Sequence, residues 1–179
     1  QFAAAEKKIK IFLDLTAPTE TETEDDWFTL QGDWNQLARL FTNLIGNAIH
    51  YTPEGGEIRV ELQHISTNKE LFSPPLLYGS TAARPYHSLL SSRLQVKVKD
   101  TGIGIPETAL PHLFDRFYRV DPARTHATGS QAVQASTGSG LGLAIAAVIV
   151  ANHQGQITAE STLGQGTIFT VTLPASGDA

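Results

Sequence analysis

Apolar residues recur at every second position in several segments of the chain, which is the pattern of β-strands with one buried face. Strands are predicted over residues 8–15, 27–30, 58–62, 94–98, 157–161 and 167–173. The last two are joined through residues 163–166, where two glycines indicate a turn, so we expect them to form a hairpin.

A helix with one apolar stripe is predicted to begin after Asp33. Its apolar positions recur three and four residues apart, at Leu37, Leu40, Phe41, Leu44, Ile45, Ala48 and Ile49. Asp33 and Gln36 have the spacing of a capping box, which places the helix start at Asp33. Residues 52–56 contain a proline and two adjacent glycines, so the helix is expected to end there.

Two more helical segments are predicted in the second half of the chain. One is a short turn near residues 110–114, and the other covers residues 140–153, which are so apolar that we expect this helix to be largely buried. Gly155 is placed to end it. These elements predict one α+β domain, a two-layer α/β sandwich in which a mixed sheet of about five strands carries three main helices on one face.

Two long connections show no periodic pattern. Residues 65–93 contain three prolines and many serines and threonines, and connections of such length are usually functional or disordered. We expect a mobile surface insertion there, with a partner-binding element as the alternative. Residues 115–137 are rich in small and polar residues and are expected to form a loop.

Composition limits the class of protein. The chain has 179 residues, of which 41% are hydrophobic, so we expect one domain with a sizeable core. It has no cysteine, which excludes disulfides, thiolate zinc sites and cysteine nucleophiles. The longest apolar run, residues 141–151, is shorter than the ~18 residues of a membrane span. Because the chain begins at Gln1 without a leader, we expect a fragment of a larger protein. We expect this fragment to be cytoplasmic and without membrane contact, and a membrane-anchored parent protein remains open.

The formal net charge of −5 comes from one segment of the chain. Its acidic residues are Glu20, Glu22, Glu24, Asp25 and Asp26, and without them acids and bases balance. We interpret this segment as a solvated loop between two strands. The absence of a basic stripe argues against a nucleic-acid partner.

Asn43 and Asn47 are four residues apart in the first predicted helix, so they lie on the same side of it, close to His50. Asparagine is a mediocre helix former, and two of them beside a core suggest a ligand. A carboxamide oxygen suits Mg²⁺, and the amide group can hold phosphate oxygens. The alternative is that both side chains are simply solvated.

Asp100 continues the buried face of its predicted strand, and the glycine-containing residues 101–106 follow it. A carboxylate on a buried face costs several kcal/mol unless donors satisfy it. The exocyclic amine of adenine is such a donor, and glycines let a ligand approach the backbone closely. The alternative is a structural aspartate that caps its own turn.

Three glycines at alternate positions, within residues 138–143, open the apolar helix. They expose successive backbone N–H groups beside a helix N-terminus, where phosphate is favoured. The spacing is GxGxG, which matches neither the dinucleotide-binding pattern nor the P-loop. The histidines lack zinc-binding spacing and the chain has no serine-hydrolase elbow, so those two chemistries lack support.

Five segments occur in a fixed order: NLIGNAIHYTP at 43–53, DTGIGIP at 100–106, LFDRFYRVD at 113–121, GSGLGLAI at 138–145 and GQGT at 164–167. In that order they resemble the N box, first glycine box, F box, second glycine box and last glycine motif of one family. That family is the catalytic and ATP-binding domain of sensor histidine kinases, within the superfamily of gyrase, the Hsp90 chaperones and MutL. The resemblance covers residues 32–174 and implies the Bergerat-type ATP-binding fold.

The resemblance implies roles for the matched residues. Asn47 would be catalytic and would coordinate the Mg²⁺ that bridges the ATP phosphates, with Asn43 in support. Tyr51 would lie against adenine, and Asp100 would accept from its amino group. Arg119 would be the second catalytic residue and would contact the γ-phosphate from an ATP lid at residues 115–137. The other implied nucleotide contacts are His50, Gly102, Gly104, Ile105, Gly138, Ser139, Gly140, Leu141, Gly142, Leu143 and Thr167.

The resemblance also implies the reaction and the partners. The domain would present the γ-phosphate of Mg-ATP to a histidine on a separate dimerisation and phosphoacceptor domain of the same parent protein, in two-component signalling with a response regulator. In the family, that histidine is followed by Glu or Asp, whereas none of the six histidines here is. We therefore expect the acceptor outside this chain, and we expect this fragment to be monomeric.

Three other functions are weighed against this one. The family often has lysine where His50 stands, and a neutral imidazole gives the phosphates less charge, which leaves a degenerate nucleotide-binding regulatory module as an alternative. A serine kinase of the anti-sigma type is a second alternative, although the F box favours the histidine-directed kind. A gyrase-like ATPase is disfavoured because no Glu or Asp lies between Trp34 and Thr52 to activate water.

Overall fold

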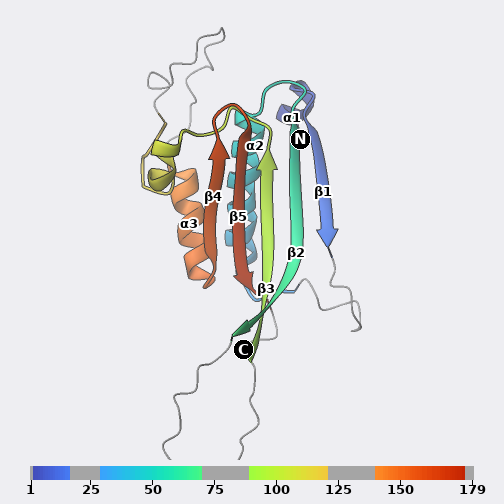
Figure 1. The fold of residues 1–179 in the computed structure, drawn as a ribbon, viewed down its shortest axis with the longest axis vertical. Coiled ribbons are helices and arrows are strands. Elements are labelled where there is room, and N and C mark those ends of the chain that lie inside the picture. The colour runs from blue at the N-terminus through green and yellow to red at the C-terminus, as the bar shows by residue number, and fades with distance from the viewer. Residues whose placement is uncertain (1, 17–28, 70–88, 121–139, 176–179) are drawn as a thin grey trace, which may run out of the picture.

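The computed structural model describes residues 2–16, 29–69, 89–120 and 140–175, which form a sheet with a helical layer on one face (Figure 1). The strands are β1 (Lys10–Thr16), β2 (Glu57–Lys69), β3 (Leu89–Asp100), β4 (Gln156–Thr162) and β5 (Gly166–Pro174). The helices are α1 (Phe2–Glu6), α2 (Trp34–Tyr51), the 3-10 helix η1 (Glu107–His112) and α3 (Gly142–Asn152). The predicted two-layer α+β class is confirmed. Two main helices, α2 and α3, form the second layer rather than the predicted three, because the short turn predicted near residues 110–114 is only the 3-10 helix η1.

The five strands form one mixed sheet in the order β1-β2-β3-β5-β4. β1 runs parallel to β2, and the other neighbouring strands are antiparallel. β4 and β5 form the predicted hairpin. Asp100, the last residue of β3, is paired with Ile58 near the start of β2. Asp100 therefore lies at the end of the sheet where the chain leaves α2 and enters β2.

The start of α2 is the one that the capping pattern predicts. Asp33 Oδ1 accepts hydrogen bonds from the backbone N–H groups of Asn35 at 2.8 Å and Gln36 at 3.1 Å. The backbone N–H of Asp33 donates to Nε2 of His153, at the end of α3, at 3.1 Å. The cap of α2 thus also joins the two main helices.

The hydrophobic core lies between the sheet and these two helices. Its buried members are Leu40, Leu44 and Ala48 from α2, Ala146, Ile149 and Val150 from α3, and Ile58, Val98, Phe169, Val171 and Leu173 from the sheet. Burial of a large aliphatic or aromatic side chain stabilises a fold by about 1.5–3 kcal/mol, so this layer contact holds the domain together. Of the helices that the structure describes, none combines the length and apolarity needed to cross a membrane.

Gly155 contributes to the end of α3 as predicted, because its N–H donates to the carbonyl oxygen of Val150 at 2.9 Å. The residue with a left-handed backbone is Gln154, with φ of 54°. A Cβ atom on Gly155 would lie 2.6 Å from the carbonyl oxygen of Thr172, so glycine is required there for packing against β5. Val148 is 50% exposed, which makes α3 less buried than its apolar sequence suggests.

The connection between β2 and β3 is shorter than the insertion predicted at residues 65–93. The two strands remain paired as far as Lys69 opposite Leu89, so both ends of that segment are strand. Apolar alternation stops before these strands end, so it predicted β2 and β3 too short. Backbone pairing between them continues where alternation has stopped. The rest of the insertion, like the acidic segment predicted to be a loop, lies outside the described residues.

β1 exposes apolar side chains that alternation predicts to be buried. Ile11, Leu13 and Leu15 are 50%, 68% and 61% exposed. β1 is an edge strand of the sheet. In Figure 1, α2 lies behind the middle of the sheet and does not cover β1, so these side chains stay exposed. Thr29 and Leu30, the described part of the second predicted strand, are not in a strand.

Candidate functional site

Asp100 is a buried carboxylate with part of its hydrogen-bonding capacity unused. It is 5% exposed, and Oδ1 accepts from the backbone N–H groups of Gly102 at 2.8 Å and Thr167 at 3.2 Å. Burial raises the pKa of Asp100 above its usual 3.8, and the two N–H donors act in the opposite direction. Oδ2 has no hydrogen bond to the described residues, so it can accept one from a ligand.

Three glycines allow backbone segments to meet around this carboxylate. A Cβ atom on Gly102 would lie 2.7 Å from both Asp100 Oδ1 and the carbonyl oxygen of Tyr51. A Cβ atom on Gly166 would lie 2.0 Å from the carbonyl oxygen of Asp100, and one on Gly104 would lie 2.1 Å from a carbonyl oxygen of β4. Gly104 and Gly166 also have positive φ angles, of 69° and 111°. Side chains are therefore excluded from all three positions.

The predicted first glycine box, residues 100–106, is held on two sides. The N–H of Ile103 donates to the carbonyl oxygen of Tyr51, at the end of α2, at 3.2 Å. The carbonyl oxygen of Ile103 accepts from the N–H of Gly164, in the β4–β5 turn, at 2.7 Å. The loop thus brings together three segments that the sequence singled out separately.

Ser161 in β4 joins the loop to β5, and no pattern in the sequence pointed to this residue. Its Oγ accepts from the N–H of Ile105 at 2.8 Å and donates to the carbonyl oxygen of Gly166 at 2.7 Å. It also lies 2.9 Å from Oγ1 of Thr167. Thr167 is 5% exposed. Its described hydrogen bonds join it to Ser161 and to Asp100.

The last turns of α2 carry four predicted site residues. Asn43 and Asn47 are half-buried, His50 is exposed, and Tyr51 is 39% exposed. The Nδ2 group of Asn43 donates to the carbonyl oxygen of Gly142 at 3.1 Å, so Asn43 faces the start of α3. Asn47 is one helical turn further along the same side. The rings of His50 and Tyr51 meet edge to face, with centroids 4.7 Å apart.

The predicted second glycine box opens α3. Gly140 has a φ of 69°, and Leu141 takes the N-cap position without a side-chain hydrogen bond to the first turn. The N–H groups of that turn, which begins at Gly142, can therefore face an anion, and the helix dipole favours one there. The side chain of Leu143 packs against the core. Residues 138 and 139 lie outside the described residues.

The F box and the second glycine box touch. The N–H of Phe117 donates to the carbonyl oxygen of Gly140 at 3.2 Å. Phe117 has a φ of 63° and is 71% exposed. This bond places the start of the predicted lid beside the described part of the second glycine box. The lid itself is described only up to residue 120, and Arg119, which is exposed there, keeps its γ-phosphate role as a prediction.

These residues fit an adenine nucleotide better than a metal ion alone. The described residues contain no group of three or more His, Asp or Glu that could hold a metal. A divalent cation at Asn47 would therefore need further oxygen ligands, such as phosphate. Mg²⁺ is usually bound in this way, through few protein ligands together with substrate phosphates and water.

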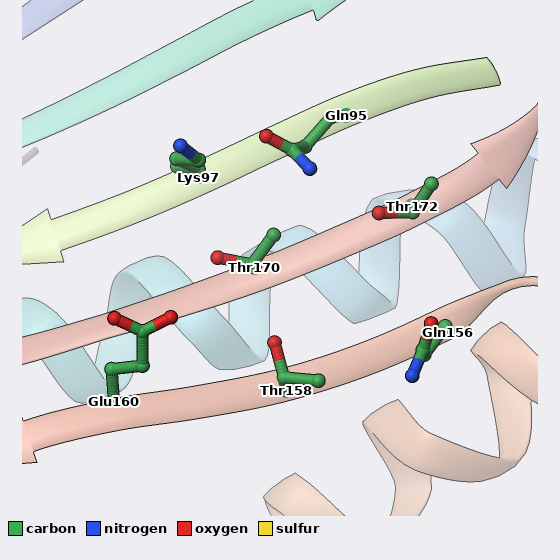
Figure 2. Close-up of a pocket in the computed structure, with 7 residues that line it drawn as sticks. All are labelled: Gln95, Lys97, Gln156, Thr158, Glu160, Thr170 and Thr172. Atoms are coloured by element: carbon green, nitrogen blue, oxygen red, sulfur yellow. The ribbon is translucent and has the colours of Figure 1, made fainter. Parts of the chain in front are cut away.

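A polar groove lies on the face of the sheet away from the helices (Figure 2). It is a shallow groove of about 300 Å³ lined by polar side chains of β3, β4 and β5: Gln95, Lys97, Gln156, Thr158, Glu160, Thr170 and Thr172. Antiparallel strands commonly expose one polar face to water. The groove is separate from the Asp100 cluster, and we do not assign the site to it.

Comparisons with known sequences agree with this geometry. Residues 32–177 match the family described as histidine kinase-, DNA gyrase B-, and HSP90-like ATPase. Sensor histidine kinase RppB of Synechocystis sp. is 37% identical over 169 residues, which cover 94% of this chain and 29% of RppB. Sensor histidine kinase WalK of Bacillus subtilis is 40% identical over 142 residues, which cover 79% of this chain and 18% of WalK. The chain thus spans less than a third of the length of these relatives.

Solved structures have the same fold. The mycobacterial sensor histidine kinase MprB matches with a TM-score of 0.62 and 22% identity, over 97% of this chain and 87% of MprB. The catalytic domain of histidine kinase ThkA matches with a TM-score of 0.61 and 20% identity, over 96% of this chain and 84% of ThkA. Full-length ShkA in complex with AMPPNP matches with a TM-score of 0.62 and 25% identity, over 99% of this chain and 28% of ShkA.

Proposed function

Because this chain belongs to the family of histidine kinase-, DNA gyrase B- and HSP90-like ATPases, we propose that it is the ATP-binding catalytic domain of a sensor histidine kinase. It binds Mg-ATP and presents the γ-phosphate to a histidine on a separate phosphoacceptor domain. The relatives named as sensor histidine kinases favour this branch of the family. The observation that carries the proposal is the buried Asp100 carboxylate, which has one oxygen available beside a cradle of glycines.

Adenine is the base that Asp100 suits. The exocyclic amine of adenine is a donor, whereas guanine has a carbonyl oxygen at the same position. That oxygen would face the carboxylate of Asp100 without a proton between them. Tyr51, whose backbone approaches Gly102 beside Asp100, would lie next to the bound base.

The phosphates fit the start of α3 and the facing side of α2. The first-turn N–H groups of α3 lack a side-chain cap among the described residues, and Asn43 fixes the backbone of that turn through Gly142. Asn47 would hold Mg²⁺, which supplies neutralisation of phosphate charge when bound. His50, exposed near the end of α2, stands where a lysine would give more positive charge.

Phosphoryl transfer requires mainly positioning and charge stabilisation from the protein. The α3 N–H groups would orient the phosphate chain, and Arg119 would approach the γ-phosphate from the lid. The segment between Trp34 and Thr52 has no Glu or Asp to activate water. This favours transfer to another residue over hydrolysis by the gyrase route.

A groove of about 500 Å³ beside α2, α3 and the F box offers a docking surface for the phosphoacceptor domain. Phe117 and Val148 line it and are 71% and 50% exposed, and Arg39 and Arg116 line it as well. Exposed apolar side chains that cluster in this way are typical of interaction surfaces. An apolar groove with arginines suits an amphipathic helix that has acidic flanks. Docking there would bring the acceptor next to the start of α3.

The proposed reaction has consequences for location and partners. Because ATP is the donor, we place the domain in the cytoplasm. The phosphoacceptor domain of the same parent protein would receive the phosphoryl group and pass it to a response regulator. On its own, we expect this domain to remain monomeric.

The test is to mix the domain with Mg-ATP labelled at the γ-phosphate and a separately purified phosphoacceptor hairpin of its parent protein. We expect an acid-labile, base-stable label on the hairpin. An acid-stable label on a hydroxyl residue would instead support the serine-kinase alternative. If the domain binds ATP but never labels a hairpin that another catalytic domain can label, the regulatory-module alternative is favoured.

A further inference from the structure

Lys7, which directly follows α1, reaches the last turn of α2. Its Nζ donates to the carbonyl oxygens of Ile49 at 3.0 Å, His50 at 2.7 Å and Thr52 at 3.2 Å. An ammonium group has three N–H donors, so these three acceptors use all of them. The side chain therefore has a single well-defined position, although 42 to 45 residues separate it from its acceptors.

The acceptors are groups that a helix leaves unsatisfied. The last carbonyl oxygens of an α-helix have no partner within the helix, and the negative end of the helix dipole favours a cation there. The Lys7 ammonium supplies both the hydrogen bonds and the charge. It therefore holds the end of α2 by a contact that is independent of the core.

The same turn of α2 contacts the nucleotide site on another side. The carbonyl oxygen of Tyr51 accepts from the N–H of Ile103 in the first glycine box. The same carbonyl oxygen of Tyr51 lies so close to Gly102 that a Cβ atom on Gly102 would be only 2.7 Å from it. The turn is thus held between Lys7 and the glycine loop next to Asp100. A shift of the turn away from Lys7 would change the spacing between Tyr51 and that loop.

Hydrogen bonds and the backbone turn next to Lys7 fix the position of its Cα atom, from which the side chain extends. The carbonyl oxygen of Lys7 accepts from the N–H of Gly55 at 2.9 Å, in the turn that follows α2. Lys8 has a left-handed backbone, with φ of 52°, which turns the chain into β1. The Lys8 side chain instead pairs with Glu54 at 2.8 Å, and both of these side chains are largely exposed.

We propose that Lys7 is a positioning residue for the adenine-binding half of the nucleotide site. It holds the last turn of α2 at the distance from the glycine loop that the base requires. This inference rests on the proposed function, since it assumes that adenine lies between Tyr51 and Asp100. Lys7 lies outside residues 32–177, which match the ATPase family, so the inference extends the site beyond the shared motifs.

The test compares two neighbouring lysines in the same chain. We expect Lys7→Met to weaken Mg-ADP binding, measured by calorimetry, by about fivefold, which is the loss expected for about one net hydrogen bond. Lys8→Met removes only an exposed ion pair and should bind within twofold of the wild type. Amide hydrogen exchange at Ile103 should become faster in Lys7→Met and stay unchanged in Lys8→Met.

Three outcomes separate the readings. In one outcome, the Lys7→Met variant keeps the Mg-ADP affinity of the wild type and unchanged exchange at Ile103. That result overturns the inference about Lys7 and leaves the proposed function intact. A wild type that does not bind Mg-ADP overturns the proposed function itself. If Lys7→Met does not fold, Lys7→Gln replaces it, since the shorter amide has two donors and no charge and cannot satisfy all three carbonyl oxygens. Wild-type affinity and Ile103 exchange in that folded variant would show that the ammonium group of Lys7 does not position the turn, which would overturn the proposal.

Discussion

The side-chain amide of Asn43 donates to the carbonyl oxygen of Gly142 at 3.1 Å, and this bond ties the middle of α2 to the first residue of α3. The two residues are 99 positions apart in the chain. Since the bond uses the carbonyl side of the Gly142 peptide, it leaves the N–H groups of the same turn for another partner. In the proposed nucleotide site, Asn43 would therefore orient the backbone N–H groups that face the phosphates.

Substitution of Asn43 should separate this orienting role from a direct ligand role. Asn43→Ala loses one hydrogen bond, with an expected cost of about 0.5–1.5 kcal/mol in the free energy of unfolding. Asn43→Asp should weaken Mg-ADP binding further, because its carboxylate would face the Gly142 carbonyl oxygen and the nearby phosphates. Calorimetry and urea unfolding measure the two effects, with exposed Thr42→Ala as the control. Wild-type behaviour of both Asn43 variants would show that the bond is unimportant.

Asp100→Asn should change the base preference of the site. The new amide would offer an N–H group where adenine also donates, so ATP affinity should fall about tenfold or more, the usual scale for a bond to a charged group. GTP affinity should fall less or rise, because guanine has an acceptor there. Competition of ATP and GTP for a fluorescent nucleotide measures the ratio, with Glu160→Gln, an exposed position on the opposite face of the sheet, as the control.

Stability should respond to Asp100→Asn in the opposite direction from affinity. Burial raises the pKa of Asp100, so the ionised carboxylate destabilises the folded domain above that raised pKa. The variant should therefore be at least as stable as the wild type near neutral pH, and its advantage should shrink as the pH falls toward 3.8. A variant that lost both affinity and stability would indicate that the aspartate is mainly structural.

Asp33 should give the reverse dependence on pH. The backbone N–H of Gln36 is the largest cause that lowers the pKa of Asp33 below its usual 3.8. The ionised cap then contributes stability that is fully present above 3.8 and is lost as the pH falls through the lowered pKa of the folded state. Urea unfolding of wild type and Asp33→Ala should differ at pH 7 and converge in acid. Asp33→Asn keeps a cap that does not titrate, so its advantage over Asp33→Ala should not depend on pH.

Gln154→Gly should stabilise the domain. Gln154 has a φ of 54° at the end of α3, a conformation that costs a residue with a Cβ atom more than it costs glycine. We expect a gain of about 0.5–1 kcal/mol in the free energy of unfolding, after the extra chain entropy of glycine is deducted. The neighbouring Gly155→Ala should instead destabilise, because its Cβ atom would meet Thr172 and Leu173 at 2.6 Å. Equal effects of the two variants would contradict this account.

Val148→Glu should block labelling of the phosphoacceptor hairpin without affecting nucleotide binding. Val148 is 50% exposed in the groove between the helices, so a charge there disturbs docking more than the core. The control is Ala151→Glu, which places the same charge on an exposed position of α3 outside the lining of the groove. If both variants label the hairpin at the wild-type rate, the acceptor docks elsewhere.

Sequence patterns correctly predicted the features that depend on neighbouring residues in the chain. The Asp33 cap fixed the start of α2, and alternation placed Asp100 on the buried face of its strand, where it is 5% exposed. Alternation misplaced the ends of β2 and β3, because pairing as far as Lys69 opposite Leu89 depends on the partner strand. Ser161 was missed for the same reason, since its role arises from contacts with distant segments.

The hydrogen bond from Thr167 to Asp100 spans 67 positions, and it has a consequence for synthesis of the chain. α2 is a single continuous segment, so it can form early. The cluster around Asp100 cannot form until β5 has left the ribosome and paired with β3. If this cluster binds adenine as proposed, nucleotide cannot guide the first steps of folding, and binding competence appears only when the sheet is complete.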